Sequence, residues 1–209
     1  MKIVKIKKFN QTQLIDRLKK VTMLKAPKQK PYQNAVISLE KLDTKQLYCP
    51  QRYLIQKNLT EIAELNWAMK KNNVDIFNLN GFVRFWLADQ SEPRDILPII
   101  VEESIEANGR VVNLVCDGMH RAYYAQIAHQ IPQVVFIRGI DKRFPYYNYP
   151  IYQGKDWDKI DLFPDLPLPD GYVKKWTREQ NYKAYYKNFN SRFKNVSVAR
   201  SEVGKSKSN

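Results

Sequence analysis

Three apolar runs, with a predicted helix between the second and the third, constrain the fold of this chain more than any other feature. The runs cover residues 96–103, 110–116 and 133–138, and Val and Ile are their commonest residues, as in buried β-strands. Residues 119–129 have the pattern of a helix. Because a helix between strands packs on a face of their sheet, the sequence predicts an α/β (α+β) fold with a small mixed sheet and flanking helices.

Local patterns predict further elements upstream of these runs. An amphipathic helix is expected at 10–21 and a strand at 34–40. Asn58 and Glu61 have the spacing of a capping box, which predicts a helix over 58–71. Another helix is predicted over 76–88, where Gly81 is the residue that opposes it and where Phe82, Phe85 and Trp86 are expected to lie in the core.

Changes in composition divide the chain into four parts. Residues 1–30 are predicted to form a basic N-terminal helix and linker, and residues 31–140 the α/β domain. Residues 141–195 are rich in Tyr and Pro, and we expect them to wrap onto the same domain and to end in a helix, because so many aromatic side chains need burial. Residues 196–209 are predicted to be a disordered basic tail.

The net charge of +14 lies at the two ends of the chain. Residues 1–30 hold ten Lys and Arg against Asp16 alone, residues 187–209 hold six against Glu202 alone, and the interval between them is neutral by count. Basic ends favour an acidic partner, for example nucleic acid. The alternative is that these charges only keep the protein in solution.

The cysteines and the apolar segments bear on localisation. Cys49 and Cys116 are far apart and in no Cys-x-x-Cys pair, which indicates neither a disulfide framework nor a zinc site. No signal peptide and no run of about 18 apolar residues is evident, so we expect a cytoplasmic protein without membrane contact.

The candidate site is the turn Asp117-Gly118-Met119-His120-Arg121, between the second apolar run and the predicted helix. Amides at a helix N-terminus, helped by the helix dipole, favour an anion, so Gly118, Met119 and His120 are predicted to hold a phosphate. Gly118 lacks a Cβ and would let a ligand approach the backbone. Arg121 could form two hydrogen bonds with the phosphate and His120 one more, while Asp117 could bind Mg²⁺. The alternative is that Asp117 is an ordinary N-cap and that His120 and Arg121 are surface residues.

The order of these elements, together with the Pro98-Ile-Ile-Val run and the Asp-Gly-Met-His-Arg-Ala turn, resembles the ParB/sulfiredoxin-like superfamily over residues 35–139, in its Asp-Gly-x-His-Arg branch. This resemblance implies a nucleotide whose phosphates sit on Gly118 to Arg121. Met119 stands where similar sulfiredoxins carry their cysteine nucleophile, which disfavours sulfinic-acid reduction. The double arginine of the partition proteins is absent, which disfavours a partition clamp.

A second candidate site combines aromatic and basic residues. Tyr146 and Tyr147 lie close in sequence to Arg138 and Arg143, and such a set could stack a base and hold phosphate. The alternative is that the tyrosines only pack on the domain.

The leading functional hypothesis is an NTP-dependent phosphotransferase or NTPase that uses ATP or another NTP, with Mg²⁺. Asp117, His120 and Arg121 would be its catalytic residues, with Arg121 stabilising the transferred phosphoryl group. The first alternative is a nucleic-acid-binding or nuclease-like protein of the same superfamily that grips DNA or RNA with its basic termini. The second is a nucleotide sensor without catalysis.

Overall fold

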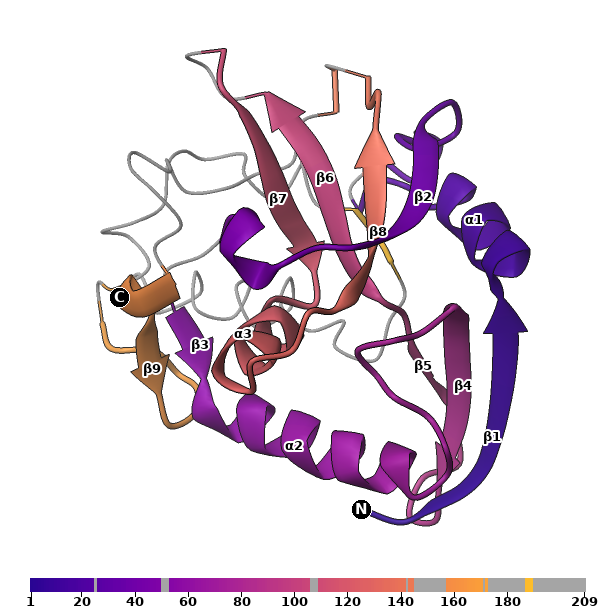
Figure 1. Cartoon of the computed structure of the whole chain (residues 1–209), viewed down its shortest axis with the longest axis vertical. Helices are drawn as coiled ribbons and strands as arrows, with labels where there is room; N and C mark the ends of the chain where they lie inside the picture. The colour runs from indigo at the N-terminus through magenta and orange to yellow at the C-terminus, as the bar shows by residue number, and fades with distance from the viewer. Residues whose placement is uncertain are drawn as a thin grey trace, which may run out of the picture.

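The computed structural model of the chain describes residues 1–24, 26–49, 53–105, 109–141, 143–144, 157–170, 172 and 187–189. A four-stranded sheet lies at its centre, in the order β2-β8-β6-β7 (Figure 1). Its strands are β2 (Val36–Lys41), β8 (Gln133–Arg138), β6 (Ile99–Ile105) and β7 (Val111–Asp117). β6 is parallel to β8 and the other two pairs are antiparallel. The predicted mixed sheet and the α/β class are therefore confirmed.

Helices cover both faces of the central sheet. The helix α3 (Met119–Ile127) packs on one face, where the buried side chains are those of Val101, Val115, Val134 and Phe136. The helix α1 (Gln11–Lys19) packs on the other through Leu14 and Leu18, against Ile100, Cys116, Val135 and Ile137. Apolar residues alternate between these two clusters, which explains why the strands are apolar at nearly every position. Cys116 is a buried core residue, as its position near a strand end predicts.

A second sheet has the order β1-β4-β5 and is antiparallel throughout. Its strands are β1 (Ile3–Asn10), β4 (Gly81–Leu87) and β5 (Arg94–Ile96). The helix predicted over 76–88 is thus wrong. Val83, Phe85 and Leu87 face one core cluster while Phe82 faces another, so large apolar groups on both faces of β4 conceal the strand period. Gly81 is needed because a Cβ there would lie 1.8 Å from the carbonyl oxygen of Phe9 on β1.

The basic N-terminal segment is part of the folded structure. The helix predicted at 10–21 is present as α1, and its first turn is closed by reciprocal hydrogen bonds of 3.0 Å between Asn10 and Gln13. The strand β1 before it is not foreseen from the sequence, because its three lysines conceal the partly buried Ile3, Ile6 and Phe9. Lys5, Lys7 and Lys8 of this segment therefore lie on a strand, and Arg17 and Lys19 lie on a helix.

The remaining elements surround the α3 side of the molecule. The helix α2 (Gln56–Lys70) packs against α3. The short strand β3 (Tyr53–Ile55) directly precedes α2 and pairs in parallel with β9 (Asp161–Phe163). Two 3-10 turns lie at Thr44–Gln46 and Trp157–Lys159. The Trp157 indole is buried and donates to the carbonyl oxygens of Thr44 at 2.9 Å and Leu47 at 3.1 Å. Within the described ranges, no helix has both the length and the apolar character that crossing a bilayer requires.

Only parts of the Tyr- and Pro-rich region are described, and of these residues 157–170 and 187–189 pack on the domain. Lys187 is buried, and its ammonium group pairs with Glu102 of β6 at 2.9 Å. Phe189 joins the cluster beneath α1, and the Asn188 amide donates to the carbonyl oxygen of Thr22 at 2.8 Å. The helix predicted to follow Thr177 and the tail at 196–209 lie outside the described residues.

Candidate phosphate-binding site

The turn between β7 and α3 is built around Gly118. Gly118 is the N-cap of α3, and its φ of 89° lies in the left-handed region that favours glycine. A Cβ on this residue would lie 2.7 Å from Nη2 of Arg121. The missing Cβ was expected to make room for a ligand. In the structure that room is filled by the guanidinium of Arg121, so glycine is required here by the protein's own packing.

Arg121 lies beneath the turn and not at the surface. Its side chain is 1% exposed; Nη2 donates to Oδ2 of Asp117 at 3.1 Å and Nη1 donates to the carbonyl oxygen of Leu97. Burial lowers the pKa of Arg121, and the neighbouring Asp117 carboxylate opposes this effect. The expectation that Arg121 points at a ligand therefore does not describe this conformation. The sequence places Arg121 in the first turn of the helix after Gly118, but it does not indicate that the side chain folds back under Gly118.

One nitrogen of this buried guanidinium lacks a hydrogen-bond acceptor among the described residues. Nε of Arg121 is buried and has no hydrogen-bond partner in the part of the chain that the structure describes. A buried donor without an acceptor is rare in folded proteins and is destabilising. Arg121 therefore keeps one unused hydrogen-bonding group directly under the turn.

His120 joins the start of α3 to the start of α2. Its Nε2 accepts a hydrogen bond of 3.1 Å from the Ile55 amide and lies 3.5 Å from Nδ2 of Asn58. Burial lowers the pKa of His120 from 6.5 to about 4, so the ring is neutral at pH 7. Because Nε2 accepts, the single ring proton is on Nδ1. His120 can therefore donate to a ligand only through Nδ1.

Met119 has its side chain in the core, with Ala122 and Val115. Only its amide can take part in a site. The amides of Met119 and His120 occupy the first two positions of α3, where the helical pattern supplies no acceptor, while the first helical hydrogen bond runs from the Ala122 amide to Gly118 at 2.8 Å.

Both helices that meet at His120 begin without a side-chain cap. Neither the N-cap Gly118 of α3 nor the N-cap Ile55 of α2 is followed by an acidic residue in the first turn, and neither helix start has a side-chain cap hydrogen bond. The N-cap predicted at Asp117 and the capping box predicted at Asn58 are therefore wrong. Asn58 already lies inside α2, because β3 runs directly into the helix and moves its start to Gln56. Two positive helix ends thus converge without a compensating carboxylate in either first turn.

Asp117 is the candidate ligand for a metal. Its carboxylate is 11% exposed and faces Arg121. Among the described residues, no group of three or more His, Cys, Asp or Glu side chains is arranged to hold a metal ion. A Mg²⁺ ion at this turn would need ligands besides Asp117, for example the oxygens of a bound phosphate.

With this geometry in place, the comparison with known families can be given. The sequence model of the family described as the ParB CE domain matches residues 13–161. The match spans well over half of the 209 residues. The chain belongs to the ParB CE domain family. No curated protein and no solved structure matches it significantly.

The family match runs from within α1 to the start of β9 and includes the whole α2–α3 junction. The ParB-like resemblance predicted over residues 35–139 is thus confirmed at the level of the family. The relation to sulfiredoxins and to a particular branch stays a prediction.

Of the second predicted cluster only Arg138 and Arg143 are described, and Arg138 lies away from the α2–α3 junction of this ParB CE domain. Asp117 pairs with Ile100, which pairs with Val135, and Arg138 lies three residues further along β8, about 10 Å away in the strand direction. Arg138 forms hydrogen bonds with Glu40 at 2.6 and 3.0 Å, and Arg143 pairs with Asp141 at 2.6 Å. Tyr146 and Tyr147 lie outside the described residues.

The structure adds groups that sequence reasoning does not find. Ile55 and Asn58 contact His120 from α2, and the carbonyl oxygen of Leu97 holds Arg121 from the segment before β6. These contacts join residues 24 to 65 positions apart, two of them through backbone groups, so no local motif could have indicated them.

Proposed function

We propose that this ParB CE domain binds the phosphate of a nucleotide at the N-terminus of α3, on the amides of Met119 and His120 and the turn at Gly118. The observation that carries the proposal is the meeting at His120 of two helix starts without side-chain caps, those of α3 and α2. In α2 the Lys57 amide donates to the carbonyl oxygen of Pro164 at 3.2 Å, so the amides offered to a phosphate are those of α3. Helix N-termini attract anions through their amides and dipoles, and no acidic side chain in either first turn competes for this position.

His120 has a defined part in this proposal. Its Nε2 is already engaged by the Ile55 amide, and its depressed pKa keeps the ring neutral. The Nδ1–H group is therefore a fixed donor that keeps its proton state across the physiological pH range. It would orient the phosphate by a neutral hydrogen bond, and the attraction would come from the helix ends and the backbone amides.

Arg121 is a positioning residue in this arrangement. It holds the Asp117 carboxylate and the Leu97 carbonyl group, and its guanidinium supports Gly118 from below. A phosphoryl-transfer role for Arg121 requires a second arrangement in which the Asp117 pair opens. The unpartnered Nε favours such a rearrangement, because it would gain an acceptor.

Catalysis is the finer part of the proposal. Phosphotransferase or NTPase activity with ATP or another NTP would need Mg²⁺ to offset phosphate charge, and Asp117, once released from Arg121, is the carboxylate at hand. A nucleotide sensor would instead keep the Asp117–Arg121 pair closed. Release of inorganic phosphate from each of the four common NTPs, with Mg²⁺, separates an NTPase from a sensor. A phosphotransferase passes the phosphoryl group to an acceptor instead, so it is detected by formation of the NDP with candidate acceptors present.

Two substitutions of His120 test the binding site. His120→Gln keeps an acceptor for the Ile55 amide but removes the Nδ1–H donor, whereas His120→Asn keeps a donor near Nδ1 and removes the acceptor. We expect His120→Gln to fold normally and to weaken nucleotide binding about tenfold, as measured by isothermal titration calorimetry, through loss of one hydrogen bond worth about 1.4 kcal/mol.

The matched control is His129→Asn, at the exposed end of α3. Asn tolerates the positive φ of 51° found at this position. Nucleotide binding unchanged in His120→Gln, or weakened equally in the His129 variant, would contradict the proposed site.

A further inference from the structure

The outer face of the β1–β4 sheet carries alternating basic and aromatic side chains. The register pairs Lys5 with Trp86, Lys7 with Arg84 and Phe9 with Phe82, so these six residues share one face. The opposite face is core, with Val83, Phe85 and Leu87. Among the described elements, α1 covers only the Phe82 end, through Leu14 and Leu18. The rest of this face is exposed to solvent at Lys5 and Lys7.

The aromatic rings on this face lie against cations. The Lys5 ammonium lies 4.9 Å from the centre of the Trp86 ring, and the Lys7 ammonium lies 5.0 Å from the Phe9 ring. Both lysines are exposed and Trp86 is partly exposed. Neither lysine pairs with a carboxylate in the described part of the chain. Flexible, unpaired lysines over aromatic rings can move to a phosphate when a base takes their place on the ring.

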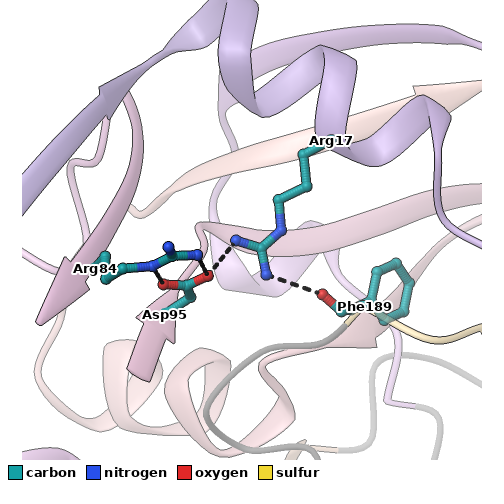
Figure 2. A network of polar contacts seen from close by, with 4 residues as sticks. All are labelled: Arg17, Arg84, Asp95 and Phe189. Atoms are coloured by element: carbon teal, nitrogen blue, oxygen red, sulfur yellow. Dashed lines mark hydrogen bonds and ion pairs between the residues drawn. The ribbon is translucent and has the colours of Figure 1, made fainter. Parts of the chain in front are cut away.

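Asp95 fixes two arginines beside these rings (Figure 2). Its carboxylate accepts from Nε and Nη2 of Arg84 at 2.7 and 3.0 Å and from Nη1 of Arg17 at 2.6 Å. Arg17 lies 4.7 Å from the Phe82 ring and also donates to the carbonyl oxygen of Phe189. The Arg84 side chain is 40% exposed, and its Nη1 has no protein partner among the described residues. Arg84 is therefore held in place with one donor directed away from Asp95.

The charge on this face is positive. Lys5, Lys7 and Arg84 lie on this face, and among the described residues the carboxylate that contacts it is that of Asp95, which Arg17 shares. Aromatic rings that stack bases, next to cations that hold the backbone, are the features by which proteins bind single-stranded nucleic acid without base pairing. A duplex hides its base faces and would use only the cations.

We propose that the outer face of β1 and β4, formed by Lys5, Lys7, Arg84 and Trp86, binds single-stranded nucleic acid. A base stacks on Trp86, and Lys5, Lys7 and Arg84 contact the phosphates. This surface is separate from the α3 turn, and the inference does not depend on nucleotide binding there.

The test is fluorescence anisotropy of labelled oligonucleotides of one mixed sequence, as single-stranded DNA, single-stranded RNA and duplex DNA. The full chain is titrated over a series of salt concentrations, with polyglutamate as a competitor. We expect a single strand to bind more tightly than the duplex, and comparison of the DNA and RNA strands identifies the preferred sugar. Tighter binding to the duplex, or equal displacement of the strand by polyglutamate, overturns the choice of partner.

Two variants localise the surface. Trp86→Leu should weaken binding of the single strand about tenfold or more by loss of stacking. Lys5→Gln/Lys7→Gln should lower the slope of log affinity against log salt by about 1.4, because two phosphate contacts are lost. Trp86→Phe keeps an aromatic ring and should retain most of the affinity. Thermal unfolding of Trp86→Leu shows whether this substitution also affects folding.

The control is a similar pair on α2. Trp67 is 61% exposed, and the Lys71 ammonium lies 3.4 Å from its ring centre. Trp67→Leu and Lys70→Gln/Lys71→Gln make the same chemical changes elsewhere on the surface. They should leave binding unchanged. Equal losses in the two sets of variants, or no loss in the β1–β4 set, would overturn the proposal.

Discussion

Gly118 and Arg121 depend on each other at the scale of single residues. We expect Gly118→Ala to destabilise the fold by about 1–2 kcal/mol through its positive φ and by about 1–3 kcal/mol more because the buried guanidinium must move. Urea unfolding measures the change. Gly139→Ala is the control, since its φ of 67° is also positive but no atom lies within 4 Å of the new Cβ. Equal effects of the two substitutions would show that Arg121 does not occupy this space.

The ion pair of Asp117 and Arg121 should be coupled strongly. Removal of one partner leaves a buried charge, so Asp117→Ala is expected to cost about 3–5 kcal/mol of unfolding free energy. Arg121→Met in the same chain should recover part of this loss, because the uncompensated charge is gone. A double-mutant cycle by chemical denaturation measures the coupling. Additive effects would contradict a direct pair.

The neutral His120 predicts a specific pH dependence of stability. Its pKa of about 4 in the fold lies below the ordinary 6.5, so the unfolded chain binds the proton first as the pH falls. The contribution is complete above about pH 7 and is lost between about pH 6.5 and 4, with a slope of up to about 1.4 kcal/mol per pH unit. His120→Gln should abolish this slope. An unchanged pH profile of urea unfolding in the variant would refute the assignment.

Residue types in the site were predictable, but side-chain directions were not. The Asp-Gly pair before a helix indicates a turn with free amides, and the structure places Gly118 at the N-cap. The inward direction of Arg121 depends on the Leu97 carbonyl group, which is 24 residues away. The acceptor role of His120 depends on Ile55, which is 65 residues away. Non-local contacts of this kind leave no pattern within a few residues of the motif.

At the scale of elements, the hydrophobic periodicity of the sequence predicted correctly those strands and helices in which each face is either buried or exposed along its whole length. The strand predicted at 133–138 is β8, and the helix predicted at 119–129 is α3, which ends two residues earlier. The pattern failed for β4, which is buried on one face and partly covered on the other, and for β1, whose edge position allows lysines at most outward sites. Predicting these two strands requires knowing that they pair with each other.

Lys187 supports the central sheet from the C-terminal region. It is buried with Glu102, which also accepts a hydrogen bond from Tyr32. Lys187→Met leaves the Glu102 charge without its cation and should lower the free energy of unfolding by about 3–5 kcal/mol. Lys57→Met is the control, because the Lys57–Asp165 pair is more than half exposed on both sides and should contribute little. Equal melting temperatures of the two variants would contradict a stabilising role of the buried Lys187–Glu102 pair.

At the scale of the whole molecule, the first 24 residues belong to the folded domain, where the sequence predicted a basic helix and linker ahead of it. They form β1 and α1 and pack into the domain, and Lys5 and Lys7 lie on one face of the β1–β4 sheet. The phosphate site lies at the α2–α3 junction, and the basic face belongs to the other sheet. The sequence predicted the mixed sheet and the ParB-like family, but the position of the basic N-terminal segment is seen only in its pairing with β4.

The amide NMR spectrum of the labelled chain, recorded during titration with ATP and then with inorganic phosphate, tests the central claim most directly. The account predicts that the largest shifts occur at the amides of Gly118, Met119 and His120, with smaller ones at the start of α2 around Asn58. It also predicts that inorganic phosphate moves the same amides. Shifts that cluster elsewhere, for example along β8 near Arg138, or no shifts at the start of α3, would contradict it.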